Sequence, residues 1–158
     1  MERILGIDPG SRVTGYGVIE KDGAKLRFVA CGVVKTDIKA GFSHRLHEIF
    51  LGINEVIQVH APVVAAVEDV FSSVSPRSAL KLGQARGAAV VAAMDNGLNV
   101  FDYTPRSVKQ GVAGHGQASK EQVQYMVRIL LNLKGVPGSD AADALAVAIC
   151  HANQLNIK

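Results

Sequence analysis

Apolar and polar positions in the first part of the chain follow the two-residue period of β-strands. Residues 3–8 form a short apolar run, and residues 13–20 alternate between apolar and polar after a Pro-Gly-Ser turn. Residues 26–36 continue in the same way after a turn at Gly23. Because short alternating runs separated by turn residues are typical of consecutive hairpins, we predict an antiparallel meander of three strands.

After the meander, the pattern changes to alternating helices and strands. Apolar residues at helical spacing predict a helix over residues 43–60, and the apolar run at residues 63–70 is typical of a strand covered on both faces. The same reasoning predicts a helix over residues 76–94 and a strand over residues 98–103. Three further helices are predicted after them. A short one begins at Thr104, a second begins at an S-x-x-Q capping box formed by Ser119 and Gln122, and the last begins near Ser139.

These elements together predict a mixed α/β fold, with a five-stranded sheet of three meander strands plus parallel strands and with helices on both faces. No linker or internal repeat interrupts the pattern, so residues 1–158 are expected to form a single domain. Residues 111–116 are expected to form a glycine-rich loop. Gly83 and Gly87 lie four residues apart on the predicted 76–94 helix, where another helix or backbone could approach closely.

Composition narrows the class of protein. The chain has 158 residues, of which 48% are hydrophobic, but its longest uninterrupted apolar run covers only Ala88–Met94. A membrane span needs about 20 such residues, so we expect a soluble, unprocessed protein without a membrane partner. Cys31 and Cys150 lie far apart and outside any Cys/His cluster, which predicts neither a disulfide framework nor a zinc site and favours the cytoplasm.

The charge is distributed unevenly along the chain. Residues 71–134 carry eight Lys and Arg against three Asp and Glu, whereas residues 1–70 carry eight against nine. A basic middle segment suits a polyanionic partner such as nucleic acid, although a surplus of this size is also common on ordinary protein surfaces.

Four acidic residues stand where packing alone would not place a charge. Asp8 ends the first predicted strand, and Glu68 ends the apolar strand at 63–70. Asp140 and Asp143 lie three residues apart in the first turn of the alanine-rich last helix, hence on one face of it. Since each acid lies at the end of a regular element, all four can converge at one edge of the sheet.

Each acid also has an ordinary structural interpretation. Asp8 could stabilise the Asp-Pro-Gly turn that follows it. Asp140 and Asp143 could interact favourably with the dipole at the start of their helix. Glu68 has the weakest alternative, because a charge between Val67 and Asp69-Val70 in a predicted inner strand has no capping role.

If the four carboxylates converge, they repel one another and raise their own pKa values unless cations neutralise them. A site with only oxygen ligands selects a hard ion such as Mg²⁺ or Mn²⁺. Two such ions about 3.5–4 Å apart can hold an attacking water and the leaving oxygen of a phosphodiester in line. The pattern therefore favours phosphodiester hydrolysis.

Several motifs, in their order and spacing, resemble the bacterial RuvC family of crossover junction endodeoxyribonucleases. The resemblance implies a ribonuclease H-like fold, a homodimer, and Mg²⁺-dependent resolution of four-way Holliday junctions by paired symmetric nicks. It also implies one or two ions per subunit with Mn²⁺ as a substitute, a RuvA-RuvB branch-migration partner, and a cytoplasmic, nucleoid-associated location. The motifs are GIDPGSRVTGYGVI (6–19), VEDVF (67–71), SALKLGQARG (78–87), VKQ (108–110), QVQYMVR (122–128) and DAADALA (140–146).

The same resemblance assigns roles to individual residues. The family's catalytic, metal-binding acids fall on Asp8, Glu68, Asp140 and Asp143; some members have a histidine at the fourth place, where this chain has Asp143. Phe71 matches an aromatic residue beside the junction centre, where it could stack on an unpaired base, although a core phenylalanine is an equal alternative. Basic residues expected to contact DNA are Arg77, Lys81, Lys109 and Lys120, with Arg86 extending the basic stretch.

Other functions remain open from the sequence. The stretch LGIDPGSRVTG also resembles the phosphate-binding turn of actin-like and sugar-kinase-like ATP-using phosphotransferases, but the chain has one copy of it and no second half. A non-catalytic junction-binding protein and a nuclease acting on RNA strands are further alternatives. For a dimer, the predicted helix at 76–94 is the expected contact surface.

Overall fold

The computed structural model describes residues 1–69 and 75–155. Its regular elements agree with the predicted ones to within a few residues at each end. In chain order they are β1 (Glu2–Asp8), β2 (Val13–Asp22), β3 (Lys25–Lys35), α1 (Phe42–His60), β4 (Val64–Glu68), α2 (Pro76–Asp95), β5 (Asn99–Tyr103), α3 (Pro105–Ala113), α4 (Lys120–Leu130) and α5 (Ser139–Gln154).

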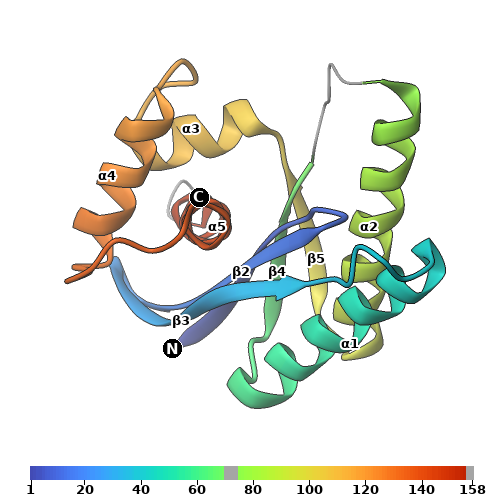
Figure 1. Cartoon of the computed structure of the whole chain (residues 1–158). Coiled ribbons are helices and arrows are strands. Elements are labelled where there is room, and N and C mark those ends of the chain that lie inside the picture. The colour runs from blue at the N-terminus through green and yellow to red at the C-terminus, as the bar shows by residue number, and fades with distance from the viewer. Residues whose placement is uncertain (70–74, 156–158) are drawn as a thin grey trace.

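The strands form one mixed sheet in the order β3-β2-β1-β4-β5. The pairs β1–β2 and β2–β3 are antiparallel, which confirms the predicted meander. The pairs β1–β4 and β4–β5 are parallel, so the carboxyl ends of β1, β4 and β5 point to the same edge of the sheet. Figure 1 shows the helices divided between the two faces, with α1 and α2 on one side and α3, α4 and α5 on the other.

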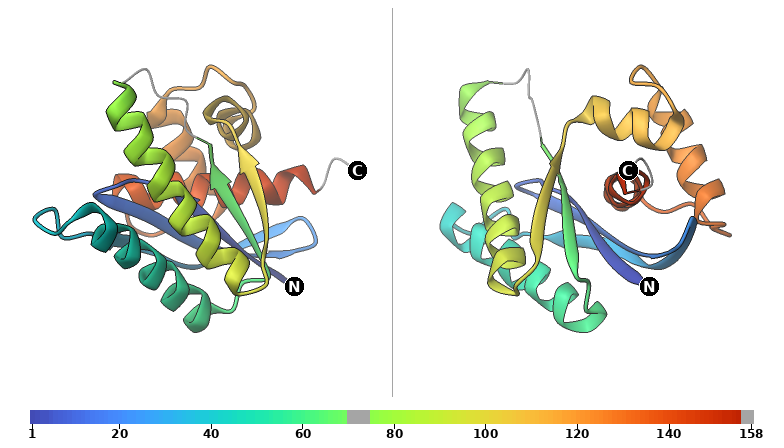
Figure 2. Two further views of the ribbon diagram at one scale, coloured as in Figure 1. Left: turned by 90° about the vertical axis from the view of Figure 1, so that its right-hand side faces the viewer. Right: turned by 180° about the vertical axis from the view of Figure 1, so that it is seen from behind.

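Each face of the sheet has its own hydrophobic core, because successive side chains of a strand point to opposite faces. Ile4 of β1 belongs to the core beneath α3, α4 and α5, whereas Leu5 and Ile7 belong to the core beneath α1 and α2. The views in Figure 2 show both helical layers against the twisted sheet. The helices predicted on both faces are thereby confirmed.

The helix α5 packs directly against β1 and β2 because three glycines face it. A Cβ atom at Gly6 would collide with the carbonyl oxygen of Ala144, and one at Gly15 would collide with that of Asp140. A Cβ at Gly17 would lie 2.6 Å from Cδ2 of Leu145. Only glycine permits this approach, which sets the position of the first turn of α5 over the sheet.

The capping box predicted at the start of α4 is present. Ser119 and Gln122 form the reciprocal capping box of α4. The expected loop at 111–116 is wrong in its first half, because α3 continues to Ala113 and ends at Gly114, which has a φ of 90°. Gly111 lies within α3 and faces Cys150 of α5: an added Cβ would lie 2.8 Å from Sγ of that residue.

Gly83 and Gly87 of α2 do not face a closely packed element among the described residues. No described atom outside the helix's own local backbone lies within 4 Å of a Cβ position at Gly83 or Gly87. The close approach considered from the sequence is therefore absent within the described subunit. Across residues 1–69 and 75–155, none of the helices has the length and hydropathy required of a membrane-spanning segment.

Candidate metal centre

Asp8 and Glu68 end the neighbouring parallel strands β1 and β4. The two strands pair in register at Ile7 and Val67, so the two acids follow at equivalent positions. Successive side chains of a strand point to opposite faces, so Asp8 lies on the same face of β1 as Ile4, opposite to Leu5 and Ile7. Glu68 lies on the same face of β4 as Ala66 for the same reason. Strand periodicity therefore directs both carboxylates to the face covered by α5.

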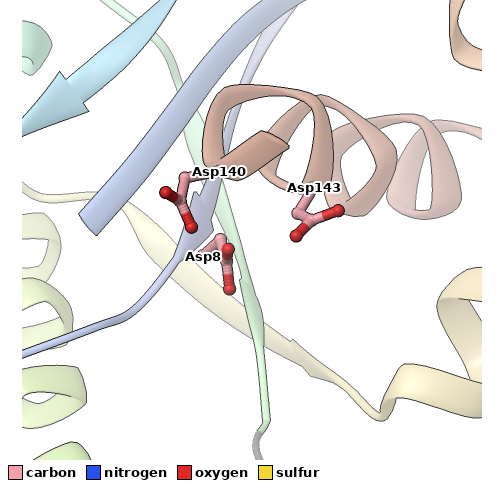
Figure 3. Close-up of side chains that lie close together, drawn as sticks. All are labelled: Asp8, Asp140 and Asp143. Atoms are coloured by element: carbon pink, nitrogen blue, oxygen red, sulfur yellow. The ribbon is translucent and has the colours of Figure 1, made fainter. Parts of the chain in front are cut away.

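The start of α5 supplies the other two acids. Asp140 is the second residue of the helix and Asp143 the fifth, so only Asp140 lies in the first turn, where the expectation had placed both. Figure 3 shows both side chains converging on Asp8. One carboxylate oxygen from each of Asp8, Asp140 and Asp143 lies within 4.8 Å of the others. Three of the four predicted acids thus form a cluster close enough to share one ion.

Glu68 lies beside this cluster rather than inside it. It lines a pocket of about 250 Å³ together with Asp143, Lys109 and Lys120. The charge of Glu68 raises the pKa of Asp8, and the charge of Asp143 raises the pKa of Glu68. The structure therefore brings all four acids to one edge of the sheet, with three in mutual reach and the fourth facing the adjoining pocket.

Burial and the charges of neighbouring acids raise the pKa values of Asp8, Glu68 and Asp143. Burial, followed by the charges of Glu68, Asp143 and Asp140, raises the pKa of Asp8 to about 8. Burial, followed by the charge of Asp143, raises the pKa of Glu68 to about 7. Burial also raises the pKa of Asp143, against the opposing effect of Lys120.

The donor set fits a hard divalent cation. All the clustered ligand atoms are carboxylate oxygens, which Mg²⁺ and Mn²⁺ prefer over softer ions. A cation between them would offset the repulsion that now raises the pKa values of Asp8 and Glu68. Among the described residues, the cation paired with the cluster is Lys120, whose Nζ lies 3.5 Å from Oδ2 of Asp143.

Two of the predicted DNA-contacting lysines flank the acids. Lys120, the first residue of α4, has a 58% exposed side chain and reaches Asp143. Lys109 of α3 lines the same pocket as Glu68, and its charge lowers the pKa of that acid. Positive groups at the rim of a carboxylate cluster are suitably placed for a phosphate that approaches the acids.

The remaining predicted contacts lie on α2 and in the segment just before it. Arg77 and Lys81 are exposed on α2 and lie four residues apart, hence on one side of that helix. Arg86 is not available in the same way, because it pairs with Asp102 and its Nε lies 3.8 Å from Oδ1 of Asp69. Phe71 lies outside the described residues.

The glycines that make the site possible were not recognised from the sequence. Gly6 and Gly17 pair directly across β1 and β2, and Gly15 pairs with Asp8. The sequence did contain an indication of this packing. Three glycines fall on one face of a predicted hairpin, and an alanine-rich helix is predicted elsewhere in the chain. Such a combination indicates that a helix backbone lies directly on the strands.

Comparison with known proteins places the chain in a family. The model of the family described as "Crossover junction endodeoxyribonuclease RuvC" matches residues 4–151. The chain belongs to the RuvC family. A RuvC protein of Acinetobacter baumannii is 57% identical over 153 residues, which cover 97% of this chain and 84% of the relative. One from Geobacter metallireducens is 56% identical over 156 residues, which cover 99% and 95%.

Solved structures of RuvC proteins agree with this assignment. The structure of Thermus thermophilus RuvC in complex with a Holliday junction substrate superposes with a TM-score of 0.94 at 41% identity, covering 99% of this chain and 96% of that one. The yeast mitochondrial Holliday junction resolvase shares the fold with a TM-score of 0.73 at 13% identity, covering 96% and 78%. The predicted ribonuclease H-like fold of the RuvC family is confirmed.

Proposed function

We propose that this chain is a Holliday junction resolvase, a metal-dependent endodeoxyribonuclease that makes paired symmetric nicks in four-way DNA junctions during recombination and repair. The observation that carries the proposal is the convergence of Asp8, Asp140 and Asp143 at one edge of the sheet, with Glu68 beside them. Membership of the RuvC family and the likeness to a relative bound to a Holliday junction substrate support the choice of DNA.

Asp8, Asp140 and Asp143 would hold Mg²⁺, with Glu68 completing the site and Mn²⁺ acting as a substitute. One or two ions per subunit would activate water for attack on phosphorus and neutralise charge on the leaving 3′ oxygen, which yields 5′-phosphate and 3′-hydroxyl ends. The protein contributes a rigid mount: β1 and β4 fix two acids, and the packing of α5 on Gly15 fixes the other two.

Basic and aromatic residues around the acids would hold the DNA. Lys109 and Lys120, at the pocket that Glu68 and Asp143 line, would contact the phosphate to be cut. Arg77 and Lys81 on α2 would contact the backbone farther away. Phe71 would stack on a base at the centre of the junction.

We further propose that residues 1–158 act as a single nuclease domain that forms a homodimer, since a nearly twofold junction is cut symmetrically by a twofold enzyme. Exposed apolar residues on α2 support this helix as the contact surface: Leu80, Val91 and Met94. Replacing Val91 with Glu should convert dimers to monomers in sedimentation experiments. A RuvA-RuvB complex would be the partner at the junction, in the bacterial cytoplasm at the nucleoid.

The test is a nicking assay on a synthetic four-way junction with linear duplex as control. Wild-type protein with Mg²⁺ should nick two opposing strands of the junction and leave the duplex intact. Asp8→Asn should abolish nicking but retain junction binding in Ca²⁺. Absence of nicking by the folded wild-type protein, or equal nicking of junction and duplex, would contradict the proposed function.

A further inference from the structure

Arg45 is a buried cation with no acidic partner in the described part of the chain. It is the fourth residue of α1, and only 9% of its surface is exposed. Its Nη2 donates to the carbonyl oxygen of Ser11 at 2.6 Å, and its Nε donates to Oγ1 of Thr36 at 3.4 Å. Among the described residues, no carboxylate lies within 4.0 Å of Arg45. Buried charges are normally paired, so this arrangement is energetically costly as it stands.

The local environment adds to that cost. The amino-terminal end of a helix carries a partial positive charge, which disfavours a nearby cation. The first turn of α1 contains no acidic residue, and the side chain of its N-cap residue is only the hydrogen of Gly41. Neither the helix nor its cap therefore offsets the charge of Arg45.

A second cation approaches the same place from another helix. The Cζ atom of Arg45 lies 5.2 Å from the ring centroid of Phe42, and Nζ of Lys81 lies 5.8 Å from the same centroid. Lys81 belongs to α2 and is exposed. Two positive side chains from α1 and α2 thus gather around one aromatic ring.

Arg45 retains one nitrogen that has no hydrogen-bond partner among the described residues. Its Nε and Nη2 are engaged, whereas within the described ranges Nη1 has no hydrogen-bond partner and is not closed off from solvent. A guanidinium presents its nitrogens in a planar fork that matches an oxyanion, and a lysine beside it supplies a point charge. The combination is suited to a phosphate group.

The position of this pair relates it to the metal centre. The carbonyl that Arg45 binds belongs to Ser11, three residues after Asp8 in the turn that leaves β1. Three residues of extended chain span at most about 11 Å. A phosphate at Arg45 would therefore lie within a few nucleotides of one held by the acids.

We propose that Arg45 and Lys81 form a binding site for a backbone phosphate of the DNA strand that enters the metal centre. The inference rests on the proposed function, because it assumes a DNA junction as substrate. It assigns Arg45 a role that the sequence did not indicate, and it gives Lys81 a specific partner. Bound phosphate would supply the negative charge that the described protein does not place at Arg45.

The first test measures the affinity for a four-way junction in Ca²⁺ by fluorescence anisotropy at several salt concentrations. Lys81→Gln and Arg45→Gln should each weaken binding about tenfold, as removal of a charge-assisted hydrogen bond does. The slope of log K against log salt should become shallower by about 0.9 for each phosphate that is no longer neutralised. Lys25→Gln is the control, because it also removes one positive charge, but from an exposed position at the start of β3. It should change neither the affinity nor the salt dependence.

The second test separates phosphate binding from a purely structural role of Arg45. Neutral methylphosphonates are placed singly at the phosphates flanking the cleavage point. For wild-type protein, one position should weaken binding about tenfold, whereas for Lys81→Gln and for Arg45→Gln the same replacement should have no further effect. An effect of the methylphosphonate that is unchanged in folded Arg45→Gln would assign Arg45 a structural role only. The measurement on Lys81→Gln uses a surface substitution, so it remains decisive if Arg45→Gln does not fold.

The inference is overturned if Lys81→Gln binds the junction with wild-type affinity and salt dependence. It is equally overturned if the effects of every methylphosphonate and of Lys81→Gln simply add. Both results can be obtained while wild-type protein still nicks the junction, which distinguishes this failure from failure of the proposed function. In the latter case, the wild-type protein itself would not nick.

Discussion

Asp8 and Glu20 lie at opposite ends of the β1–β2 strand pair, and their surroundings shift their pKa values in opposite directions. The side chain of Glu20 is 11% exposed, and it accepts hydrogen bonds from Arg3 and Arg27 at 2.9 Å each. The hydrogen bond from Arg3, assisted by Arg27, lowers the pKa of Glu20. Asp8 has acids as its neighbours, and its pKa is raised to about 8.

The residue across the ladder accounts for much of this difference. Arg3 pairs with Glu20 between β1 and β2, whereas Gly15 pairs with Asp8. At one end, a cation on the neighbouring strand neutralises the acid. At the other end, a glycine admits α5 and two further acids. We therefore interpret Glu20, which is paired with arginines, as a structural acid, and the half-buried Asp8, which lies among other acids, as a ligand for an external cation.

The largest expected difference between the two sites is in cleavage. Glu68→Gln should reduce junction cleavage by more than about 100-fold, which exceeds the effect typical of residues that only support a metal ligand. Glu20→Gln should leave cleavage within about twofold at a temperature where the variant is folded. Single-turnover nicking rates measure both. A similar decrease in the two variants would mean that the neighbours of an acid do not distinguish a functional role from a structural one.

The next largest effect concerns pH and Mg²⁺ affinity. Because the pKa of Asp8 is raised to about 8 and that of Glu68 to about 7, metal must displace protons in neutral solution. The Mg²⁺ concentration for half-maximal cleavage should therefore fall as the pH is raised from 6 to 7. The decrease should be about tenfold for each proton that metal binding releases. Glu20→Gln should show the same slope as wild type. A Mg²⁺ requirement independent of pH would contradict the assigned protonation.

A smaller effect is expected when the approach of α5 is altered without a change in charge. Gly15→Ala places a methyl group against the carbonyl of Asp140 and should lower stability by about 1–3 kcal/mol. It should also reduce cleavage, because Asp140 moves relative to Asp8. Gly135→Ala is the matched control, since no described atom lies within 4 Å of its Cβ position. Thermal denaturation and nicking rates that are equal in the two variants would refute this account of the glycine.

The smallest effect is on the stability of the metal-free protein. Since the folded-state pKa of Asp8 is raised, its contribution to stability is present in acid and lost as pH rises toward about 8. Asp8→Asn should therefore raise the melting temperature at pH 8 by about 3 °C, which corresponds to about 1 kcal/mol in a domain of this size. At pH 4 the gain should disappear.

The same melting experiment gives the opposite sign at the other end of the strand pair. The pKa of Glu20 is lowered, so its stabilisation is present above its ordinary value and is lost in acid. Glu20→Gln should therefore lower the melting temperature at pH 7 and have little effect at low pH. Two variants that shift the melting temperature in the same direction at pH 8 would remove the distinction between these acids.

Much of the fold and part of the site could be predicted from the sequence because they depend on local periodicity. Alternation located the meander, and the capping box at Ser119 located the start of α4. The ends of β1 and β4 marked Asp8 and Glu68 as unusual acids. The end of α3 was mispredicted, because Gly111 suggested a loop, whereas it lies in the helix and its lack of a side chain leaves room for Cys150, which is distant in the sequence.

The sequence by itself determined which residues alternate, where helices begin, and that Asp8 and Glu68 each stand at the end of an apolar strand. These are short-range properties of the backbone. Only the tertiary structure decided that Asp8, Asp140 and Asp143 lie within 4.8 Å while Glu68 lines the pocket beside them. It also decided that Arg45 is buried with no acid beside it among the described residues. The physical reason is that these distances depend on how closely α5 and α1 approach the strands, which glycines and packing across the whole domain control.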